Sequence, residues 1–583
     1  MKRAFVAVFA VAAISACHGR APSGGGHQPL PPDDRDPSLP VPPPPPLVEE
    51  PQPPTAPINE LPVWVAPATE KIQPLEAERD TKSASISAAR NEFEAFQVVI
   101  TGAATGVRAE ATRLVGPEGF EIRDIRLYRA ALIDIRELSA LDGTLGPTPD
   151  ALIPDQDEIV GERRNAFPFD VPAGESRAIW VDVFVPPSAP AGVYTGSVSV
   201  RFDGETAVVP VELTVWPFIL PSTSSVKSAF GVSYNTLESG HQMTAVSELR
   251  ARYGQLGLDH RISLSKHLDD RWGDLANFDQ HYGPLMNGTA PTRLPGAQLT
   301  SVEYIGTLTD TADLGRWAAH FEARGWFDRL FQYTCDEPPY QGCDWLPHIQ
   351  ERSNAAKAAN PNFRTLVTTS IQNATEHDGA QYLDLMVPNV NHMENTSGEY
   401  AGNQRPKYDA FLAGGPLKEV WMYQACDSHT CGGQDEQGTG WPSYMIDASA
   451  VRNRAMQWML FKYDATGELY WDTTWAYVTK SDPWVSQWDF TGNGDGTLFY
   501  PGTPAKIGGA THIPVASIRL KMIREGMEDY EYLRLVAEHG DPAFAKSVAN
   551  ALFPTMRSTG SVSGNELMAA RAALARRIIE LTQ

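Results

Sequence analysis

The stretch TADLGRWAAHFEARGWFDRLFQYTCDEPP, residues 311–339, decides the fold of this chain. Its first half has the period of an amphipathic helix, with apolar residues spaced i, i+3, i+4 and i+7 at Leu314, Trp317, Ala318 and Phe321. We therefore expect a helix over 311–324, ended by Gly325, and a strand over 329–334. Pro338 and Pro339 end that strand because proline cannot donate to the hydrogen-bond ladder.

The same alternation of strand and helix extends over 222–513. Strands are expected at 227–234, 261–266, 329–334, 363–369, 383–387, 419–423 and 468–471. Helices are expected at 246–256, 311–324, 347–359 and 450–463. Repeated βα units predict a (β/α)8 TIM-like barrel, and residues 514–583 indicate a C-terminal helical segment packed on it.

Residues 61–221 have a different pattern. Alternating apolar and polar residues at 178–185, 193–200 and 207–216, together with the run 85–100, predict strands separated by glycine and proline. Such spacing is typical of an antiparallel β-sandwich. The chain is therefore expected to be multidomain, with the sandwich preceding the barrel.

Composition limits the possible functions. The 583 residues suggest about three domains at roughly 100–200 residues each. The 48 Lys and Arg against 71 Asp and Glu give a net charge of −23. This acidic balance argues against a nucleic-acid partner, because phosphate binding needs a basic face.

The first 60 residues are expected to be an export signal and a spacer. Lys2 and Arg3 precede an apolar run of secretory-signal length, and 14–17 (Ile-Ser-Ala-Cys) resembles a bacterial lipobox. Residues 1–17 would then be a lipoprotein signal peptide, with lipidation at Cys17. Because His18 is not the aspartate of an inner-membrane retention signal, we expect a cell-envelope protein anchored in the outer membrane by lipid alone.

Residues 18–60 are expected to be a disordered linker. The segment 21–60 holds 15 of the 47 prolines, including five in a row from Pro42 to Pro46. Such a stretch cannot bury apolar surface and favours an extended spacer.

The chemical centre is expected at Asp336 and Glu337, because barrel enzymes carry catalytic groups at the C-terminal ends of their strands. Ordinary glycosidases place two carboxyl groups on opposite sides of the scissile bond. Neighbours on one strand end act from one side instead. This favours substrate-assisted retaining hydrolysis, with Glu337 as general acid and Asp336 holding the acetamido N–H of the sugar.

Polar and aromatic residues at other strand ends are candidates for substrate binding. Aromatic faces stack on the C–H faces of sugars. The residues expected at the rim of the site are Tyr423, Trp421, Trp471, Trp475 and Asn391. A glycan or glycoconjugate is therefore the expected substrate.

Cysteines 335, 343, 426 and 431 form two closely spaced pairs. In an exported protein we expect disulfides Cys335–Cys343 and Cys426–Cys431, each closing a loop at the rim. No nucleotide-binding loop, zinc-ligand spacing or calcium-loop spacing occurs in the sequence. We therefore expect no metal and no cofactor.

Several segments resemble a known family. The Asp336-Glu337 pair resembles the catalytic pair of glycoside hydrolase family 123, the β-N-acetylgalactosaminidases, and ARNEFEAFQ (89–97) and AGVYTG (191–196) look like its N-terminal sandwich. The segments GDGTLFYPG (494–502), SIRLK (517–521) and REGMEDYEYL (524–533) resemble the C-terminal segment named domain of unknown function 4091. The resemblance implies β-linked N-acetylgalactosamine as substrate and Tyr423 as a contact of the acetamido group. Charged residues of the last two segments are expected to dock a helix on the barrel through ion pairs.

Two alternatives stay open. A barrel glycosidase could use a protein nucleophile on a sugar without an acetamido group, with Asp427 and Asp472 as the nearest candidates. The protein could also be a non-catalytic surface lipoprotein that binds glycans.

Overall fold

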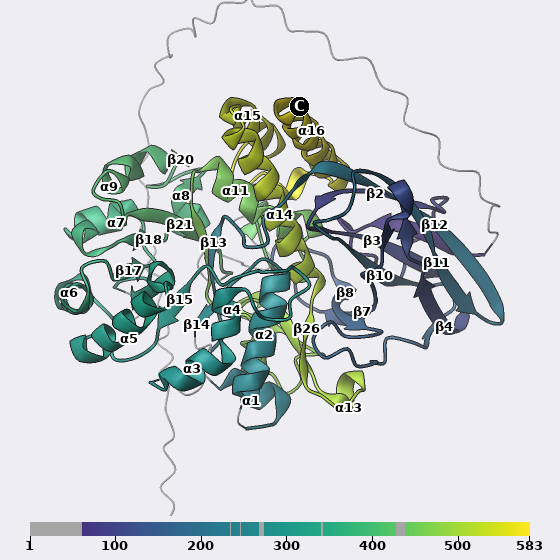
Figure 1. Ribbon diagram of the computed structural model, residues 1–583, viewed down its shortest axis with the longest axis horizontal. Coiled ribbons are helices and arrows are strands. Elements are labelled where there is room, and N and C mark those ends of the chain that lie inside the picture. The colour runs from purple at the N-terminus through teal and green to yellow at the C-terminus, as the bar shows by residue number, and fades with distance from the viewer. Residues whose placement is uncertain (1–60, 234, 245, 267–272, 340–341, 427–437) are drawn as a thin grey trace, which may run out of the picture. The chain divides into compact units, whose positions relative to one another are not determined.

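The computed structural model describes residues 61–233, 235–244, 246–266, 273–339, 342–426 and 438–583 (Figure 1). The predicted signal peptide, Cys17 and the proline-rich linker lie outside the described residues. None of the helices in the described ranges is long and apolar enough to cross a membrane.

Two sheets build the N-terminal part. The first is antiparallel, in the order β1 (Val63–Pro67), β3 (Glu92–Thr101), β10 (Ser176–Val185), β7 (Ile125–Ile135) and β8 (Gly146–Pro154). The second has the order β2 (Ala84–Arg90), β12 (Glu205–Ile219), β11 (Gly192–Phe202), β4 (Ala104–Ala111) and β9 (Phe169–Val171), with the short β5 (Leu114–Val115) and β6 (Glu121–Ile122) beside β11. Apolar residues of both sheets, such as Val98 of β3 and Val200 of β11, share one buried core.

One difference from the expected strands lies at Asn91. The sequence suggested a single run over 85–100, but Asn91 has a φ of 61° and divides it. Asparagine tolerates this left-handed conformation better than most residues. The two halves, β2 and β3, consequently belong to different sheets.

Eight parallel strands form the second part, a nearly closed barrel. In chain order they are β13 (Lys227–Gly231), β14 (Leu264–Lys266), β15 (Val302–Tyr304), β16 (Leu330–Cys335), β17 (Arg364–Val367), β18 (Leu385–Met386), β21 (Glu419–Tyr423) and β22 (Gly467–Tyr470). Each strand pairs with the next one in this order and β22 pairs with β13, except at one junction: among the described residues no ladder joins β14 to β15. There the backbone N–H of Thr300 donates to Ser263 Oγ at 2.7 Å.

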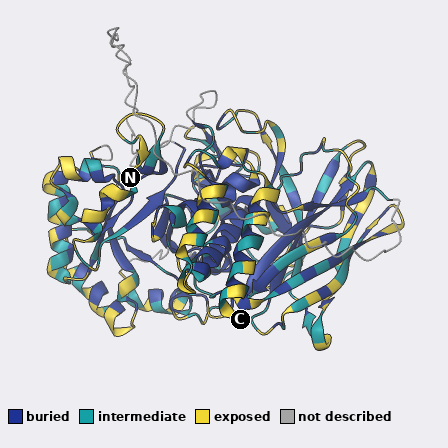
Figure 2. Cartoon of the chain, turned by 90° about the horizontal axis from the view of Figure 1, so that it is seen from above, coloured by how far each residue is buried: buried dark blue, intermediate teal, exposed yellow. Residues whose placement is uncertain are grey.

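Helices surround this barrel (Figure 1). They include α2 (Ser247–Asp259), α5 (Thr311–Ala323), α6 (Gln350–Ala359), α7 (Ile371–Glu376), α10 (Ala450–Arg454) and α11 (Met456–Lys462). Leu314, Trp317 and Phe321 of α5 are fully buried, as the spacing predicts. Figure 2 shows buried residues concentrated in the strands and on the inner faces of the helices.

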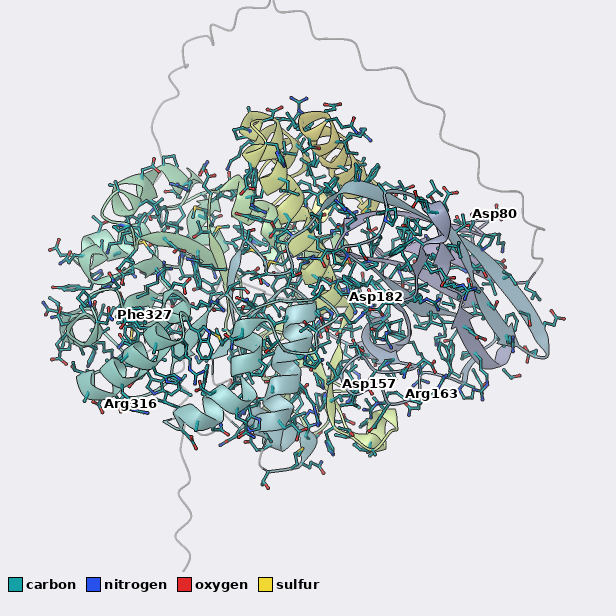
Figure 3. The ribbon with its side chains drawn as sticks, viewed as in Figure 1. Asp80, Asp157, Arg163, Asp182, Arg316 and Phe327 are labelled. Carbon is teal, nitrogen blue, oxygen red and sulfur yellow. A yellow bond between two sulfur atoms is a disulfide. The ribbon has the colours of Figure 1, made fainter. Side chains whose placement is uncertain are left out.

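The C-terminal helices α14 (Ile518–Glu538), α15 (Pro542–Leu552) and α16 (Gly564–Thr582) follow the hairpin of β25 (Phe499–Gly502) and β26 (Ile513–Ala516). Ion pairs also join α14 to strands of the N-terminal sheet, not only to the barrel. Arg524 and Lys521 bind Asp182 on β10, and Arg519 binds Asp150 on β8 at 2.8 Å. All five side chains are buried. Because Arg454 of α10 also binds Asp529 of α14, at 2.6 Å, helix α14 joins the sheets to the barrel. Figure 3 labels Asp182.

Candidate active site

Asp336 and Glu337 follow β16 directly. Glu337 has a φ of 43°, a left-handed conformation that is uncommon for a residue with a side chain. The backbone N–H of Glu337 donates to Thr368 Oγ1 at 2.8 Å, which ties this turn to the end of the neighbouring β17. The two carboxylates are thus held at the C-terminal edge of the barrel, as expected for a catalytic pair in such a fold.

Two hydroxyl groups orient the carboxylate of Asp336. Tyr333 OH donates to Asp336 Oδ1 at 2.6 Å, and Thr368 Oγ1 donates to the same oxygen at 2.8 Å. The other oxygen, Oδ2, has no hydrogen-bond partner among the described residues and remains available to a ligand. Thr368 therefore contacts both members of the pair, accepting from the backbone of Glu337 and donating to Asp336.

Tyr423 contacts the second carboxylate. It ends β21, three strands away from β16 in the barrel order, and its side chain is nearly buried. Its hydroxyl donates a hydrogen bond to Glu337 Oε1. Tyr423 therefore lies beside Glu337, and the expectation that it contacts the acetamido group of the substrate stays a prediction.

Cavities open on both sides of the pair. A cavity of about 600 Å³ beside Glu337 falls in the roughly 300–1,000 Å³ range of small-molecule sites. Its lining includes Glu337, Thr368, Ser370, Glu376, His392, Tyr400 and Tyr423. A smaller cavity of about 240 Å³ lies beside Asp336 and is lined by Lys266, Glu303, Tyr333 and Arg352, among others.

Glu303, at the centre of β15, is a third carboxylate of the site. Burial raises its pKa to about 7; the charge of Lys266 opposes this and that of Asp336 adds to it. Sequence reasoning missed Glu303 because β15 has only three residues, too few to show a period. Thr368 was also missed, although it directly follows β17 and barrel enzymes carry catalytic groups at the C-terminal ends of their strands.

The aromatic residues expected at the rim have different positions. Trp421 is 1% exposed and packs inside the barrel with Phe331 and Leu366, with its Nε1 donating to Glu419 at 3.0 Å. This corrects the expectation that Trp421 contacts the substrate. The side chains of β21 alternate, and the position two residues before Tyr423 shares its inward direction but lies one layer deeper.

Trp471 and Trp475 lie after β22, where their rings pack edge to face at 5.3 Å. Phe490 contacts both rings and is partly exposed. Neither tryptophan lines the cavity beside Glu337. Asn391 is half-buried on the short helix α8 (Val390–Met393), next to the cavity residue His392.

The structure contains the disulfide Cys335–Cys343, directly before Asp336, with the Cα atoms 6.1 Å apart. Cys426 is also disulfide-bonded. Cys431 lies outside the described residues, so the pairing Cys426–Cys431 stays a prediction. Across the described ranges, no group of three or more His, Cys, Asp or Glu side chains could hold a metal ion.

Asp336 and Glu337 lie within the part of the chain that a family model matches. Residues 298–536 match the family model "Glycoside hydrolase 123, catalytic domain", a range that begins before β15 and ends in α14. A search of curated proteins found no match.

Among solved structures, a family 123 glycoside hydrolase from Clostridium perfringens is similar at 13% identity, with a TM-score of 0.63, covering 89% of this chain and all of the other. At this identity the likeness shows the fold. Two other glycosidases are less similar. A family 39 glycoside hydrolase from Bacteroides cellulosilyticus has 10% identity and a TM-score of 0.25, with 69% of this chain and 76% of the other covered. A β-D-glucuronidase from Dictyoglomus thermophilum has 10% identity and a TM-score of 0.27, with 76% of this chain and 68% of the other covered, and both scores are too low to indicate a shared fold. With its carboxylate pair inside a matched glycoside hydrolase 123 catalytic domain, the protein is an enzyme, a glycoside hydrolase.

Proposed function

We propose that the protein hydrolyses β-linked N-acetylhexosamine, with N-acetylgalactosamine as the sugar, by a substrate-assisted retaining mechanism. Glu337 donates a proton to the leaving oxygen and later takes one from water. The acetamido oxygen of the sugar attacks the anomeric carbon, and Asp336 accepts the acetamido N–H and stabilises the oxazolinium intermediate. The family resemblance of the pair supports the choice of sugar.

The observation that carries this proposal is the environment of Asp336. Tyr333 and Thr368 both donate to Oδ1, which leaves Oδ2 to accept a hydrogen bond from the substrate. The acetamido group then occupies the smaller cavity beside Asp336, and the leaving group occupies the larger one beside Glu337. In this arrangement the acetamido oxygen supplies the nucleophile on the face of the anomeric carbon opposite the leaving group, so no protein nucleophile is needed there.

The competing mechanism needs a protein nucleophile, and the buried environment of Asp472 argues against that role for it. Its side chain is completely buried and accepts hydrogen bonds from Ser233 Oγ and the backbone of Thr474. Burial raises its pKa to about 7, so at neutral pH a large fraction of it is protonated and cannot attack carbon. Asp427, the other candidate, lies outside the described residues.

The N-terminal segment supports a proposal for the biological setting. The lipobox-like sequence ending at Cys17 supports a bacterial lipoprotein anchored in the outer membrane. The proline-rich linker would then hold the TIM-like barrel, with its C-terminal segment of the 4091 type, away from that membrane. The similar Clostridium perfringens protein is described as hydrolysing glycolipid glycans. We therefore propose a glycan or glycoconjugate outside the cell as the substrate.

Hydrolysis of an aryl N-acetylgalactosaminide, compared with the N-acetylglucosaminide and with a galactoside, tests this function. We expect cleavage of the first, inhibition by a thiazoline analogue of the oxazoline, and loss of turnover on natural glycans in Glu337→Gln by about 10²–10⁴-fold. Glu376→Gln, which changes another carboxylate of the same cavity, is the matched control. Cleavage of the galactoside at a comparable rate would instead favour a protein nucleophile, and an active Glu337→Gln enzyme on a natural glycan would refute the assignment of the acid.

A further inference from the structure

Two arginines face each other on the sheet formed by β4 and β11, far in the sequence from the catalytic pair. The antiparallel register places Arg201 directly opposite Arg108, and Ser199 opposite Glu110. Both arginine side chains are exposed. Like charges directly opposite each other on neighbouring strands destabilise a sheet, so the Arg108–Arg201 pair does not contribute to the stability of this one.

Neither arginine is neutralised within the described part of the chain, where no ion pair to Arg108 or Arg201 occurs. The neighbouring cations differ in this respect. Arg163 binds both oxygens of Asp155, at 2.8 and 3.0 Å, and Arg126 binds Asp124 at 3.0 Å. The guanidinium N–H groups of Arg108 and Arg201 are therefore available to bind a ligand.

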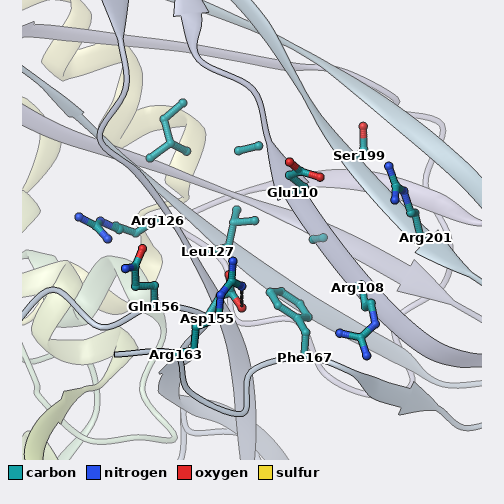
Figure 4. Close-up of a pocket in the computed structure, with 13 residues that line it drawn as sticks. Arg108, Glu110, Arg126, Leu127, Asp155, Gln156, Arg163, Phe167, Ser199 and Arg201 are labelled. Atoms are coloured by element: carbon teal, nitrogen blue, oxygen red, sulfur yellow. Dashed lines mark hydrogen bonds and ion pairs between the residues drawn. The ribbon is translucent and has the colours of Figure 1, made fainter. Parts of the chain in front are cut away.

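A cavity of about 400 Å³ joins these residues at the edge between the two sheets. Its lining contains four arginines and two carboxylates, a net charge of +2 in a chain whose total is −23. Leu127 and Phe167 supply apolar surface. In the view of Figure 4, Phe167 lies between the Arg163–Asp155 pair and Arg108.

We propose that this cavity binds an acidic sugar unit, one that carries a carboxylate or a sulfate ester. Guanidinium groups bind both anions through paired N–H donors, and Arg108 and Arg201 line the same cavity without an ion pair to another described residue. An aromatic ring beside the cations gives the C–H face of a sugar ring a surface to stack on, which a free inorganic anion does not need. The site is separate from Asp336 and Glu337 and does not depend on the reaction proposed for them.

Titration calorimetry on the full-length protein tests this site with tetrasaccharides that contain no acetamido group, so that the catalytic site does not compete. The three probes are tetragalacturonate, a sulfated galactan tetrasaccharide and neutral galactotetraose. We expect at least one acidic probe to bind, more weakly as salt is raised from about 50 to about 500 mM, because exposed charges are screened. Which acidic probe binds more tightly distinguishes carboxylate from sulfate.

The double variant Arg108→Gln/Arg201→Gln should weaken this binding at least tenfold, and the single variant Arg201→Gln at least threefold. The matched control for the double variant is Arg113→Gln/Arg123→Gln. It changes two exposed arginines that pair with Glu121 and do not line the cavity. Thermal melting should show no loss of stability in the Arg108/Arg201 variant, because a like-charge contact is removed. Unchanged affinity in that variant, equal binding of the neutral probe, or no binding of either acidic probe to the wild type would each overturn the proposal.

Discussion

The hydroxyl of Tyr423 donates a hydrogen bond to Oε1 of Glu337, although 86 residues separate them in the chain. The contact exists because β16 and β21 end at the same edge of the barrel. It connects the end of β21 to the group proposed to transfer the proton, and it makes the role of Tyr423 testable without changing the acid itself.

Tyr423→Phe removes this hydrogen bond and leaves the ring in place. Hydrogen bonds to charged groups contribute about 1.5–3 kcal/mol, so we expect kcat/KM to fall by about 10–100-fold on an aryl glycoside. Tyr400→Phe is the matched control, because Tyr400 lines the same cavity but its hydroxyl lies 3.1 Å from Ser370 Oγ. Equal losses in the two variants would contradict a specific role for Tyr423.

Thr368→Val keeps the shape of the side chain and removes the hydroxyl that contacts both carboxylate residues. The backbone N–H of Glu337 loses its acceptor and Asp336 loses a donor. We expect kcat to fall about tenfold or more, and Thr368→Ser to restore most of the activity. The neighbouring Thr369→Val serves as control, since Thr369 lines the cavity and contacts neither carboxylate among the described residues. If Thr368→Val and Thr369→Val behaved alike, Thr368 would have no special positioning role.

Asp182→Asn tests the connection between the sheets and α14. Burial alone would raise the pKa of Asp182, but the charges of Arg524, Lys521 and Arg293 outweigh it and hold the pKa well below its usual value. Removing the negative charge leaves three buried cations without their shared partner, which should cost about 3–5 kcal/mol in the free energy of unfolding. Chemical denaturation measures this value.

The control for that variant is Asp134→Asn, which removes an exposed partner of Arg136. Exposed ion pairs contribute about 0–1 kcal/mol, so little change is expected. A loss below about 1 kcal/mol in Asp182→Asn would show that the buried cluster contributes little to stability.

Glu468→Gln tests the pH dependence of stability. Burial raises the pKa of Glu468 to about 7, and the hydrogen bonds from Tyr444 and Gln457 oppose this rise. The folded state therefore holds a proton that the unfolded state, with a pKa near about 4.3, releases. Between about pH 4.5 and 7 the free energy of unfolding should decrease as the pH rises, by up to ~3 kcal/mol from this group.

Melting curves from about pH 4.5 to 8 measure this effect. The slope should be smaller in Glu468→Gln than in the wild type, because glutamine does not titrate. Glu376→Gln, on the exposed side of the larger cavity, should leave the slope unchanged. Parallel curves for wild type and Glu468→Gln would mean that Glu468 is charged in the folded state throughout this range.

Local patterns in the chain are enough to locate most of the barrel and to place the Asp336–Glu337 pair at a strand end. Strand β16 is a mostly apolar segment followed closely by two prolines, so the sequence alone places its last residues, and with them Asp336 and Glu337, at a strand end. Helix α5 shows the same kind of determination, because its buried face repeats at helical spacing. The short separation of Cys335 and Cys343 likewise predicts a disulfide that the structure contains.

Only the tertiary structure decided which residues meet at the site. Strand β15 is too short to show a period, so Glu303 could not be found by pattern. Thr368 and Tyr423 reach the pair through the parallel register of β17 and β21, and register depends on contacts between distant segments. Trp421 and Tyr423 are both large aromatic residues with the same inward direction, but their depth in the barrel makes the first a core residue and the second a partner of Glu337.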